Sequence, residues 1–209
     1  DAGEYVSPIS SPLRRFTATI GQLVGGRIIV GQGAVHATKV GLTIAIKYAF
    51  SRKQFGPVGK PETPLISFLS HQLRLVPLLA KTYALQFALN KLKAMFGTLN
   101  STSGPERDEL SKELHVLAAG LKPMATWHKN EALQTARECC GGMGFLAANR
   151  IAILRIDSDI DTTWEGDNTV LLQQVSGSLL KEFKDQFKGD SAPSKFRGLL
   201  RYLESETLF

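Results

Sequence analysis

Thr162-Thr163-Trp164-Glu165-Gly166-Asp167-Asn168-Thr169-Val170-Leu171-Leu172 is the stretch that decides how the rest of the chain is interpreted. A glutamate stands here between an aromatic residue and a glycine, and polar capping residues follow directly before an apolar run. This order is typical of a helix N-terminus, so we expect Glu165 to lie in a turn that leads into a helix beginning near Asp167. Two interpretations of Glu165 are open. It is a site carboxylate that a ligand approaches over Gly166, or it is an ordinary first-turn acid that the helix dipole favours.

The composition describes a chain that can build a sizeable apolar core. It has 209 residues, of which 43% are hydrophobic, and a formal net charge of +6. This length suits one or two domains. Lysines and arginines are scattered, so no nucleic-acid contact is predicted, whereas a basic surface can attract a phosphate-bearing substrate. The two cysteines, Cys139 and Cys140, are adjacent, which argues against a disulfide framework and favours a reducing compartment.

Neither a metal site nor a membrane span is predicted. The histidines and cysteines show no metal-ligand spacing. Asp157, Asp159 and Asp161 alternate as in a calcium loop, but the glycine and glutamate that such a loop needs are missing downstream. We interpret these acids as solvated or helix-capping residues. No apolar run is long and clean enough to cross a bilayer, and neither end carries a recognisable address signal.

Apolar periodicity predicts an all-α fold, an antiparallel four-helix bundle. The four helices are expected at residues 16–55, 63–96, 106–140 and 167–187. Thr63 is expected to cap the second helix and Pro64 to occupy its first turn. Residues 149–163 are expected to be irregular. Patterns that alternate with the period of a β-strand are nearly absent.

The bundle is expected to be one part of a larger protein. Residues 1–15, which contain prolines and serines, are interpreted as a linker from a preceding domain. Residues 188–209 are interpreted as a second linker and the start of a further, truncated helical domain. The first helix is rich in glycine, at a cost of about 1 kcal/mol per glycine relative to alanine, so close packing or ligand approach is expected there. Arg27 in that helix needs a partner and is either a structural ion-pair residue or a site residue.

Three motifs in order carry a resemblance to a known family. Arg52-Lys53-Gln54-Phe55-Gly56 follows the first helix, Glu138-Cys139-Cys140-Gly141-Gly142-Met143-Gly144-Phe145 ends the third, and Trp164-Glu165-Gly166-Asp167-Asn168 opens the fourth. Over residues 16–187 the chain resembles the C-terminal helical domain of the acyl-CoA dehydrogenase and acyl-CoA oxidase superfamily. Asp167-Asn168 and the segment 70–79 are similar to the oxidase branch, in particular to plant-like peroxisomal members.

The resemblance implies a flavoenzyme of peroxisomal fatty-acid β-oxidation. Such an enzyme oxidises fatty acyl-CoA to trans-2-enoyl-CoA with FAD, and in oxidases O₂ reoxidises the flavin and yields H₂O₂. Glu165 corresponds to the base that removes the α-proton, and its N–H to a donor for the thioester oxygen. Arg27 and Gly166 correspond to substrate-side residues. Some family members place the base at a position that matches Gly26, where this chain has no carboxylate.

The resemblance also implies an FAD site that two subunits share. Arg52 corresponds to the arginine on the FAD pyrophosphate, where a planar donor fork suits the task. Further cofactor contacts are implied for Gln54, Phe55, Glu138, Gly141, Gly142 and Asn168, although the family usually has glutamine at the position of Glu138. In a homodimer, Arg52 and the glycine pair would serve the FAD of the partner, and Glu165 its own. The isolated chain is expected to be inactive, because by resemblance much of the flavin and acyl chain is held by preceding helical and β domains that this chain lacks.

Two alternative functions stay open at this point. One is a dehydrogenase of the same fold, which passes electrons to an electron-transfer flavoprotein. The other is a helical dimerisation module without chemistry of its own. Peroxide formation and the flavin absorbance of the intact protein distinguish these possibilities.

Overall fold

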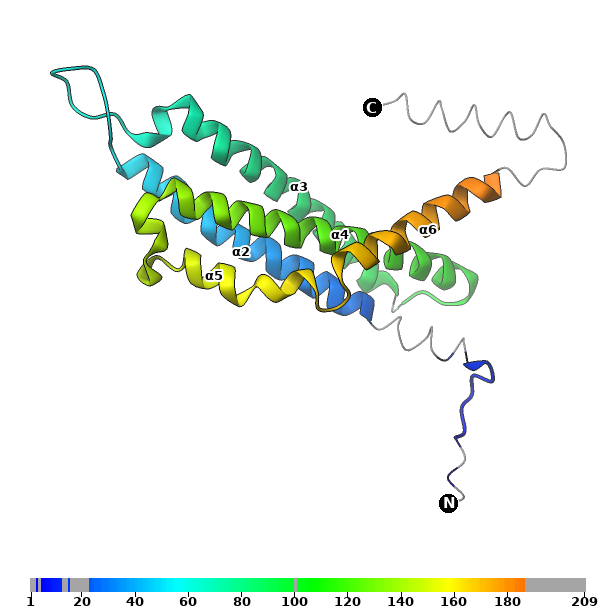
Figure 1. Cartoon of the computed structure of the whole chain (residues 1–209). Helices are drawn as coiled ribbons and strands as arrows, with labels where there is room; N and C mark the ends of the chain where they lie inside the picture. The colour runs from blue at the N-terminus through cyan, green and yellow to red at the C-terminus, as the bar shows by residue number, and fades with distance from the viewer. Residues whose placement is uncertain (1–2, 4, 13–14, 16–22, 100, 187–209) are drawn as a thin grey trace.

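The computed structural model describes residues 3, 5–12, 15, 23–99 and 101–186, and most of these belong to long helices (Figure 1). The helices are α2 (Leu23–Ser51), α3 (Leu69–Leu99), α4 (Gly104–Cys139), α5 (Ile151–Asp157) and α6 (Asn168–Gln186). Short 3₁₀ turns lie at Leu65–Ser67, Gly141–Phe145, Ala147–Asn149 and Asp159–Thr162. Within the described ranges no strand is formed, but Lys53 and Pro64 form an isolated antiparallel β-bridge. The all-α prediction is confirmed.

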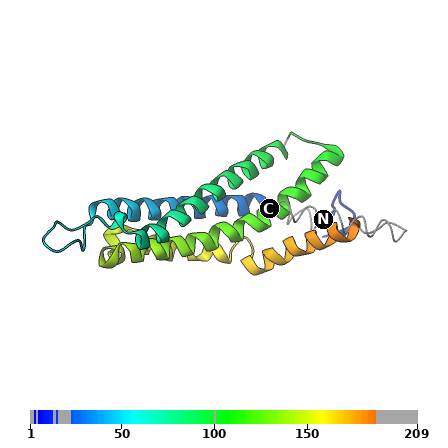
Figure 2. The ribbon, with the colours of Figure 1, turned by 90° about the horizontal axis from the view of Figure 1, so that it is seen from above.

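Successive long helices run in opposite directions, so α2 and α4 are parallel and α3 is antiparallel to both (Figures 1 and 2). The most extensive contact in the bundle is between α2 and α4. Gly31 of α2 lies beside Leu89 of α3 and the backbone of Lys122 in α4, and Gly41 lies beside Leu133 further along α4. The C-terminal ends of α2 and α4 therefore share one end of the bundle.

The fourth position of the bundle is filled by two helices in succession. α5 packs on the C-terminal part of α4, and α6 packs on its N-terminal part, where Gly120 faces Val175. Both follow α4 in the opposite direction (Figure 1). The four-helix bundle is thus confirmed, but its fourth member is interrupted between residues 158 and 167. This interruption, halfway along α4, is where Glu165 lies.

The glycines of α2 allow close contact with its neighbours. A Cβ on Gly25 would meet Phe96 at 3.3 Å, and one on Gly31 would meet Leu89 at 3.0 Å. A Cβ on Gly33, by contrast, would meet no described residue outside its own stretch of helix within 4 Å. The prediction of close approach is confirmed for Gly25, Gly31 and Gly41, and Gly33 is the exception. α2 is also long and apolar enough to cross a membrane by length and composition, but half of that window is buried in the bundle, as in a core helix. The absence of a membrane span stays a prediction.

The second helix begins later than predicted. Pro64 is extended, with φ −57° and ψ 139°, and lies in a short ladder with the residues that follow α2. Gln54 N–H donates to the Thr63 carbonyl at 3.0 Å, and Leu65 N–H donates to the Arg52 carbonyl at 2.9 Å. Thr63 and Pro64 therefore serve a hairpin-like turn, and α3 begins at Leu69.

The prediction of an irregular segment at residues 149–163 was wrong. This segment contains α5 and the 3₁₀ turn Asp159–Thr162. Asp161 was expected to be solvated but is 8% exposed, and its Oδ2 lies 2.8 Å from Nζ of the buried Lys129. The missing cue was the lysine partner, which is 32 positions earlier in the sequence. Predictions for residues 1–2, 4, 13–14, 16–22 and 187–209 concern positions outside the described residues.

Candidate active site

The residues singled out from the sequence form two groups on the bundle. The first, named the Glu165 cluster, comprises Gly26, Arg27, Glu165, Gly166 and Asn168, together with Lys122. The second, named the terminal cluster, lies at the C-terminal ends of α2 and α4 and comprises Arg52, Gln54, Phe55, Glu138, Gly141 and Gly142. From Gly26 to the end of α2, a helix rise of 1.5 Å per residue separates the clusters by about 38 Å.

Glu165 occupies a tight turn between the two halves of the fourth bundle position. Its φ is 55°, and that of Gly166 is 113°. A left-handed non-glycine residue costs on the order of 1–3 kcal/mol and is common at functional sites. Asp167 Oδ1 accepts the N–H groups of Thr169 at 2.9 Å and Val170 at 3.2 Å. The predicted capped helix start after Glu165 is therefore confirmed.

The carboxylate of Glu165 faces the backbone of α2 at Gly26. A Cβ on Gly26 would lie 2.5 Å from Glu165 Cδ, so any side chain there would displace the carboxylate. Glu165 Oε2 is buried, and in the described part of the chain nothing donates a hydrogen bond to it. The N–H of Glu165 likewise makes no hydrogen bond with a described residue. The turn thus presents an acceptor and a donor that no described residue pairs with.

Arg27 joins this turn from α2. It is 3% exposed, and its Nε donates to the Glu165 carbonyl at 3.1 Å. Its Nη1 is buried without a partner among the described residues. Burial lowers the pKa of Arg27, and the nearby Glu165 charge opposes that shift. Since buried polar atoms in native proteins are almost always hydrogen-bonded, the free Arg27 and Glu165 atoms indicate a site for a polar ligand.

Lys122 is the main residue of this cluster that sequence reasoning missed. Its side chain is fully buried, and its Nζ donates to the Gly166 carbonyl at 2.8 Å and to Asn168 Oδ1 at 2.9 Å. Burial lowers the pKa of Lys122 to about 8, although Asp161 and Asp167 oppose the shift. Lys122 and Lys129 are seven residues apart on the face of α4 that also buries Ala118, Ala125 and Ala132. Two lysines in an apolar heptad pattern were the available signal.

Asn168 is engaged within the protein. It is 2% exposed, and its Nδ2 donates to Thr126 Oγ1 at 2.9 Å while its Oδ1 accepts from Lys122. The amide of Asn168 is therefore used at both ends. Its predicted cofactor contact stays a prediction, and the observed contacts give this side chain a role in holding the turn.

The terminal cluster is open to solvent. Arg52 and Gln54 are exposed, and the Arg52 guanidinium has no hydrogen-bond or ion-pair partner in the described ranges. Phe55 has a φ of 58°, is 70% exposed and contacts the edge of Phe68, with ring centroids 6.5 Å apart. Apart from its neighbours in the chain, no described residue lies within 4 Å of a Cβ built on Gly141 or Gly142. An exposed guanidinium without a partner among the described residues suits a phosphate-bearing ligand, and so does uncovered backbone.

Glu138 differs from its neighbours in the terminal cluster because its carboxylate is paired. Arg74 Nη2 of α3 lies 2.6 Å from Glu138 Oε2, and Gln134 donates to Oε1. Both partners of the ion pair are about two-fifths exposed, so the pair adds little stability. The pairing does, however, offset the negative charge of Glu138 at the end of α4 that leads into the glycine pair.

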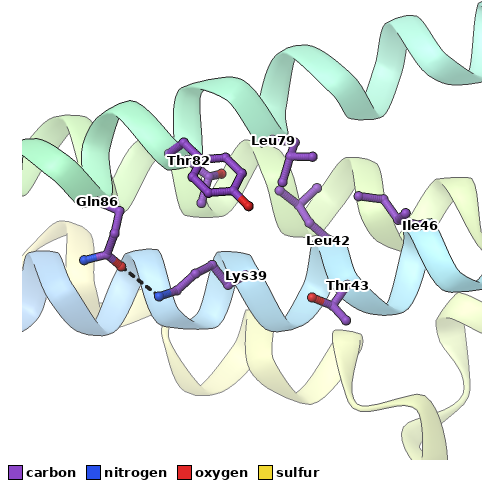
Figure 3. A pocket seen from close by; sticks show the side chains of 8 residues that line it. Lys39, Leu42, Thr43, Ile46, Leu79, Thr82 and Gln86 are labelled. Atoms are coloured by element: carbon purple, nitrogen blue, oxygen red, sulfur yellow. Dashed lines mark hydrogen bonds between the residues drawn. The ribbon is translucent and has the colours of Figure 1, made fainter.

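A separate apolar pocket lies between α2 and α3 (Figure 3). It has a volume of about 260 Å³ and is lined by four residues of each helix at the same spacing: Lys39, Leu42, Thr43 and Ile46, then Leu79, Thr82, Tyr83 and Gln86. Lys39 Nζ donates to Gln86 Oε1 at 2.7 Å across its opening. The pocket shares no lining residue with either cluster.

Comparison with known proteins shows similarity to one family. Residues 20–180 match the family described as acyl-CoA oxidase, C-alpha1 domain. Peroxisomal acyl-coenzyme A oxidase 2 of Arabidopsis thaliana is 44% identical over 187 residues, which are 90% of this chain and 27% of that protein. The structure of Arabidopsis thaliana acyl-CoA oxidase 1 matches with a TM-score of 0.79 at 30% identity. The matched region covers 94% of this chain and 30% of the oxidase chain.

A third similar structure contains a cofactor. Acyl-CoA oxidase-1 of Caenorhabditis elegans, complexed with FAD and ATP, matches with a TM-score of 0.73 at 30% identity. The matched region covers 78% of this chain and 25% of that oxidase chain. The chain spans about a quarter of the length of the curated relatives it matches. These matches concern the helical bundle that carries both clusters.

Proposed function

The chain belongs to the acyl-CoA oxidase family, whose C-alpha1 domain it contains, and on this premise we propose that it supplies the catalytic base of a fatty acyl-CoA oxidase. The reaction removes a proton from the α-carbon and a hydride from the β-carbon of the acyl chain, which gives trans-2-enoyl-CoA. FAD, when bound, would supply the hydride acceptor, and O₂ together with that hydride and one proton, equivalent to the one taken from the α-carbon, would give H₂O₂.

The carboxylate of Glu165, whose Oε2 is buried without a partner among the described residues, is the observation that carries this proposal. An α-proton beside a thioester is a weak acid, so its removal needs a positioned base and a donor for the developing oxyanion. Glu165 offers both, because its Oε2 and its N–H have no partner among the described residues. Arg27 completes the substrate side with an unpaired Nη1 and, through Nε, holds the Glu165 carbonyl.

The terminal cluster is proposed to hold FAD. The exposed Arg52 guanidinium suits the pyrophosphate, and the bare backbone at Gly141 and Gly142 suits a flat adenosine group. Gln54 and Phe55 lie beside Arg52 in the same exposed turn. Glu138 contributes in a form whose charge Arg74 offsets. FAD fits the chemistry of these residues, and the similar Caenorhabditis elegans oxidase structure, which contains FAD, supports the choice of cofactor.

The separation of the clusters supports a shared site in a homodimer. About 38 Å of helix lies between Gly26 and the end of α2, which exceeds the length of an extended dinucleotide. One FAD cannot reach Arg52 and Glu165 of the same chain. In the proposed homodimer, two-fold symmetry would place each terminal cluster at the Glu165 cluster of the other chain. An exposed apolar stripe on α3, made by Leu69, Leu73, Val76, Tyr83 and Phe87, provides surface for further contacts.

The proposed compartment is the peroxisome, since several similar proteins, among them those of Arabidopsis thaliana and Homo sapiens, are named peroxisomal. Oxygen as the electron acceptor follows from the same oxidase names. A dehydrogenase of this fold would instead reduce an electron-transfer flavoprotein, and a dimerisation module would bind no flavin. Both alternatives are outcomes of the experiment that follows.

The experiment measures peroxide formed by the full-length protein on a panel of acyl-CoA chain lengths. Glu165→Gln should retain FAD and lose at least the roughly 10²–10⁴-fold in kcat that a general base contributes. Glu106→Gln is the matched control, because Glu106 is an exposed first-turn acid of α4 remote from both clusters. Turnover without peroxide would assign the protein to the dehydrogenases, and near-normal activity of Glu165→Gln would refute its role as the base.

The shared site is tested by mixing two inactive variants. A dimer of one Glu165→Gln chain and one Arg52→Ala chain has one site with both lesions and one site with neither. Partial activity should therefore reappear after subunit exchange. If exchange is confirmed and the mixture stays inactive, each chain completes its own site.

A further inference from the structure

The turn that carries Glu165 has few internal constraints. Thr163 and Trp164 N–H both donate to the Ile160 carbonyl, and helix α6 begins its ladder with Leu171 N–H donating to Asp167. Between these points, the N–H groups of Glu165 and Gly166 donate to no described residue. Gly166 lacks a side chain, so its φ of 113° is one of many conformations open to it. Something outside the turn must select that conformation.

Two cations on different helices hold the successive carbonyls of this turn. Arg27 Nε from α2 binds the Glu165 carbonyl at 3.1 Å, and Lys122 Nζ from α4 binds the Gly166 carbonyl at 2.8 Å. Lys122 also binds Asn168 Oδ1 at 2.9 Å, which ties the first residue of α6 to the same ammonium. Thr126 in turn bonds both Asn168 Nδ2 and the Lys122 carbonyl. The network fixes the peptide planes on the C-terminal side of Glu165.

We propose that Lys122 is a positioning residue, which orients Glu165 for proton removal through its hydrogen bonds to the Gly166 carbonyl and to Asn168. The inference rests on the proposed function, since it takes Glu165 as the base. A fully buried ammonium is costly unless it is well bonded. In the described part of the chain no carboxylate forms an ion pair with Lys122, in contrast to Lys129, which has Asp161. If Lys122 served only the stability of the fold, an apolar residue would be favoured at this buried position. Holding Glu165 in one orientation, by contrast, requires the hydrogen bonds that the Lys122 ammonium donates.

The test replaces Lys122 by methionine, which keeps the length of the side chain and removes its donors, in the full-length enzyme. A displacement of about 1 Å at a reacting group costs on the order of 10²-fold in rate, so kcat should fall by about that factor. KM for acyl-CoA and the flavin content should not change. The kinetic isotope effect with acyl-CoA deuterated at the α-carbon should rise, because proton removal becomes slower relative to the other steps.

Lys129→Met combined with Asp161→Asn is the matched control. Lys129 is equally buried on the same face of α4 and holds the Ser158 carbonyl before the turn, but among the described residues it forms no hydrogen bond with residues 165–168. This double variant should have a lower Tm without a larger isotope effect. In addition, methylamine should restore part of the kcat of Lys122→Ala, because the small amine can occupy the place of the ammonium.

Wild-type kcat and isotope effect in Lys122→Met would overturn the inference. Loss of flavin or folding in both Lys122→Met and Lys122→Gln, without rescue of Lys122→Ala by methylamine, would also overturn it, since Lys122 would then be merely structural. These outcomes are distinct from failure of the proposed function. That failure appears as a full-length wild type without acyl-CoA oxidation, or as an active Glu165→Gln.

Discussion

Gly26→Ala is expected to inactivate the enzyme while leaving its fold intact. A Cβ at this position would lie 2.5 Å from Cδ and Oε2 of Glu165, whereas ordinary contacts begin at 3.4 Å. The carboxylate must therefore move by about 1 Å, a displacement that costs on the order of 10²-fold in rate at a reacting group. Because the clash involves the end of a flexible side chain, the fold can adjust. Replacing a helical glycine by alanine also stabilises a helix by about 1 kcal/mol.

The assay is peroxide formation by the full-length protein, together with flavin content and thermal unfolding. Gly33→Ala serves as the control, since it makes the same substitution seven residues along α2 where no atom lies within 4 Å of the new Cβ. Gly33→Ala should keep the wild-type kcat, and Gly26→Ala should lose it with an unchanged or higher Tm. Equal kcat values for the two variants would show that catalysis does not depend on the position of the Glu165 carboxylate beside Gly26.

Three further outcomes are expected. Arg52→Ala should weaken FAD binding by about 1.5–3 kcal/mol, the value of a charge-assisted hydrogen bond. The flavin content after gel filtration measures this loss, and full occupancy would contradict the cofactor role. Gly41→Ala should destabilise the fold by about 1–3 kcal/mol in urea melts because the new Cβ collides with Leu133, and an unchanged midpoint would contradict this. Burial lowers the pKa of His128 from 6.5 to about 4, so the unfolded state binds the extra proton between these pH values. The free energy of unfolding should therefore fall by at most about 3 kcal/mol as the pH drops through this window, and His128→Gln should flatten the fall.

The neutral state of His128 has a clear physical cause. Thr82 Oγ1 donates to the Leu78 carbonyl at 2.7 Å and lies 2.8 Å from His128 Nε2, so the ring N–H on Nε2 is assigned as the donor to Thr82. His128 Nδ1 is buried without a partner among the described residues. Protonation there would bury a donor with no acceptor, in addition to burying a charge.

Local sequence signals were sufficient for the helices and for the turn at Glu165. The capping order Asp167-Asn168-Thr169 and the following apolar residues predicted the start of α6 correctly, because helix capping depends on neighbours in the chain. The same reasoning failed at Thr63-Pro64, which have the chemistry of a helix start. There the ladder with residues 52–55 determined the conformation, and that pairing is tertiary.

The contents of the Glu165 cluster were only partly predictable. Glu165 and Arg27 followed from their motif and their apolar surroundings, but Lys122 and Lys129 did not. Each lysine is explained by oxygens more than 25 residues away in the sequence. Periodicity places a lysine on the buried face of α4, but it cannot show which carbonyl that lysine meets. The parallel arrangement of α2 and α4, by contrast, agrees with the antiparallel bundle that the sequence predicted, in which the first and third helices run in the same direction (Figure 1).

The exposed stripe on α3 affects how this chain behaves before assembly. Contiguous apolar surface on a lone chain promotes association with any similar surface nearby. Newly made copies would therefore compete between correct docking and aggregation, and dilution or a folding chaperone would favour the former. Solubility of this region in isolation should accordingly decline with concentration and improve when Leu73, Tyr83 and Phe87 are made polar. Those substitutions lie outside the buried core of the bundle and would remove surface that the proposed homodimer can use.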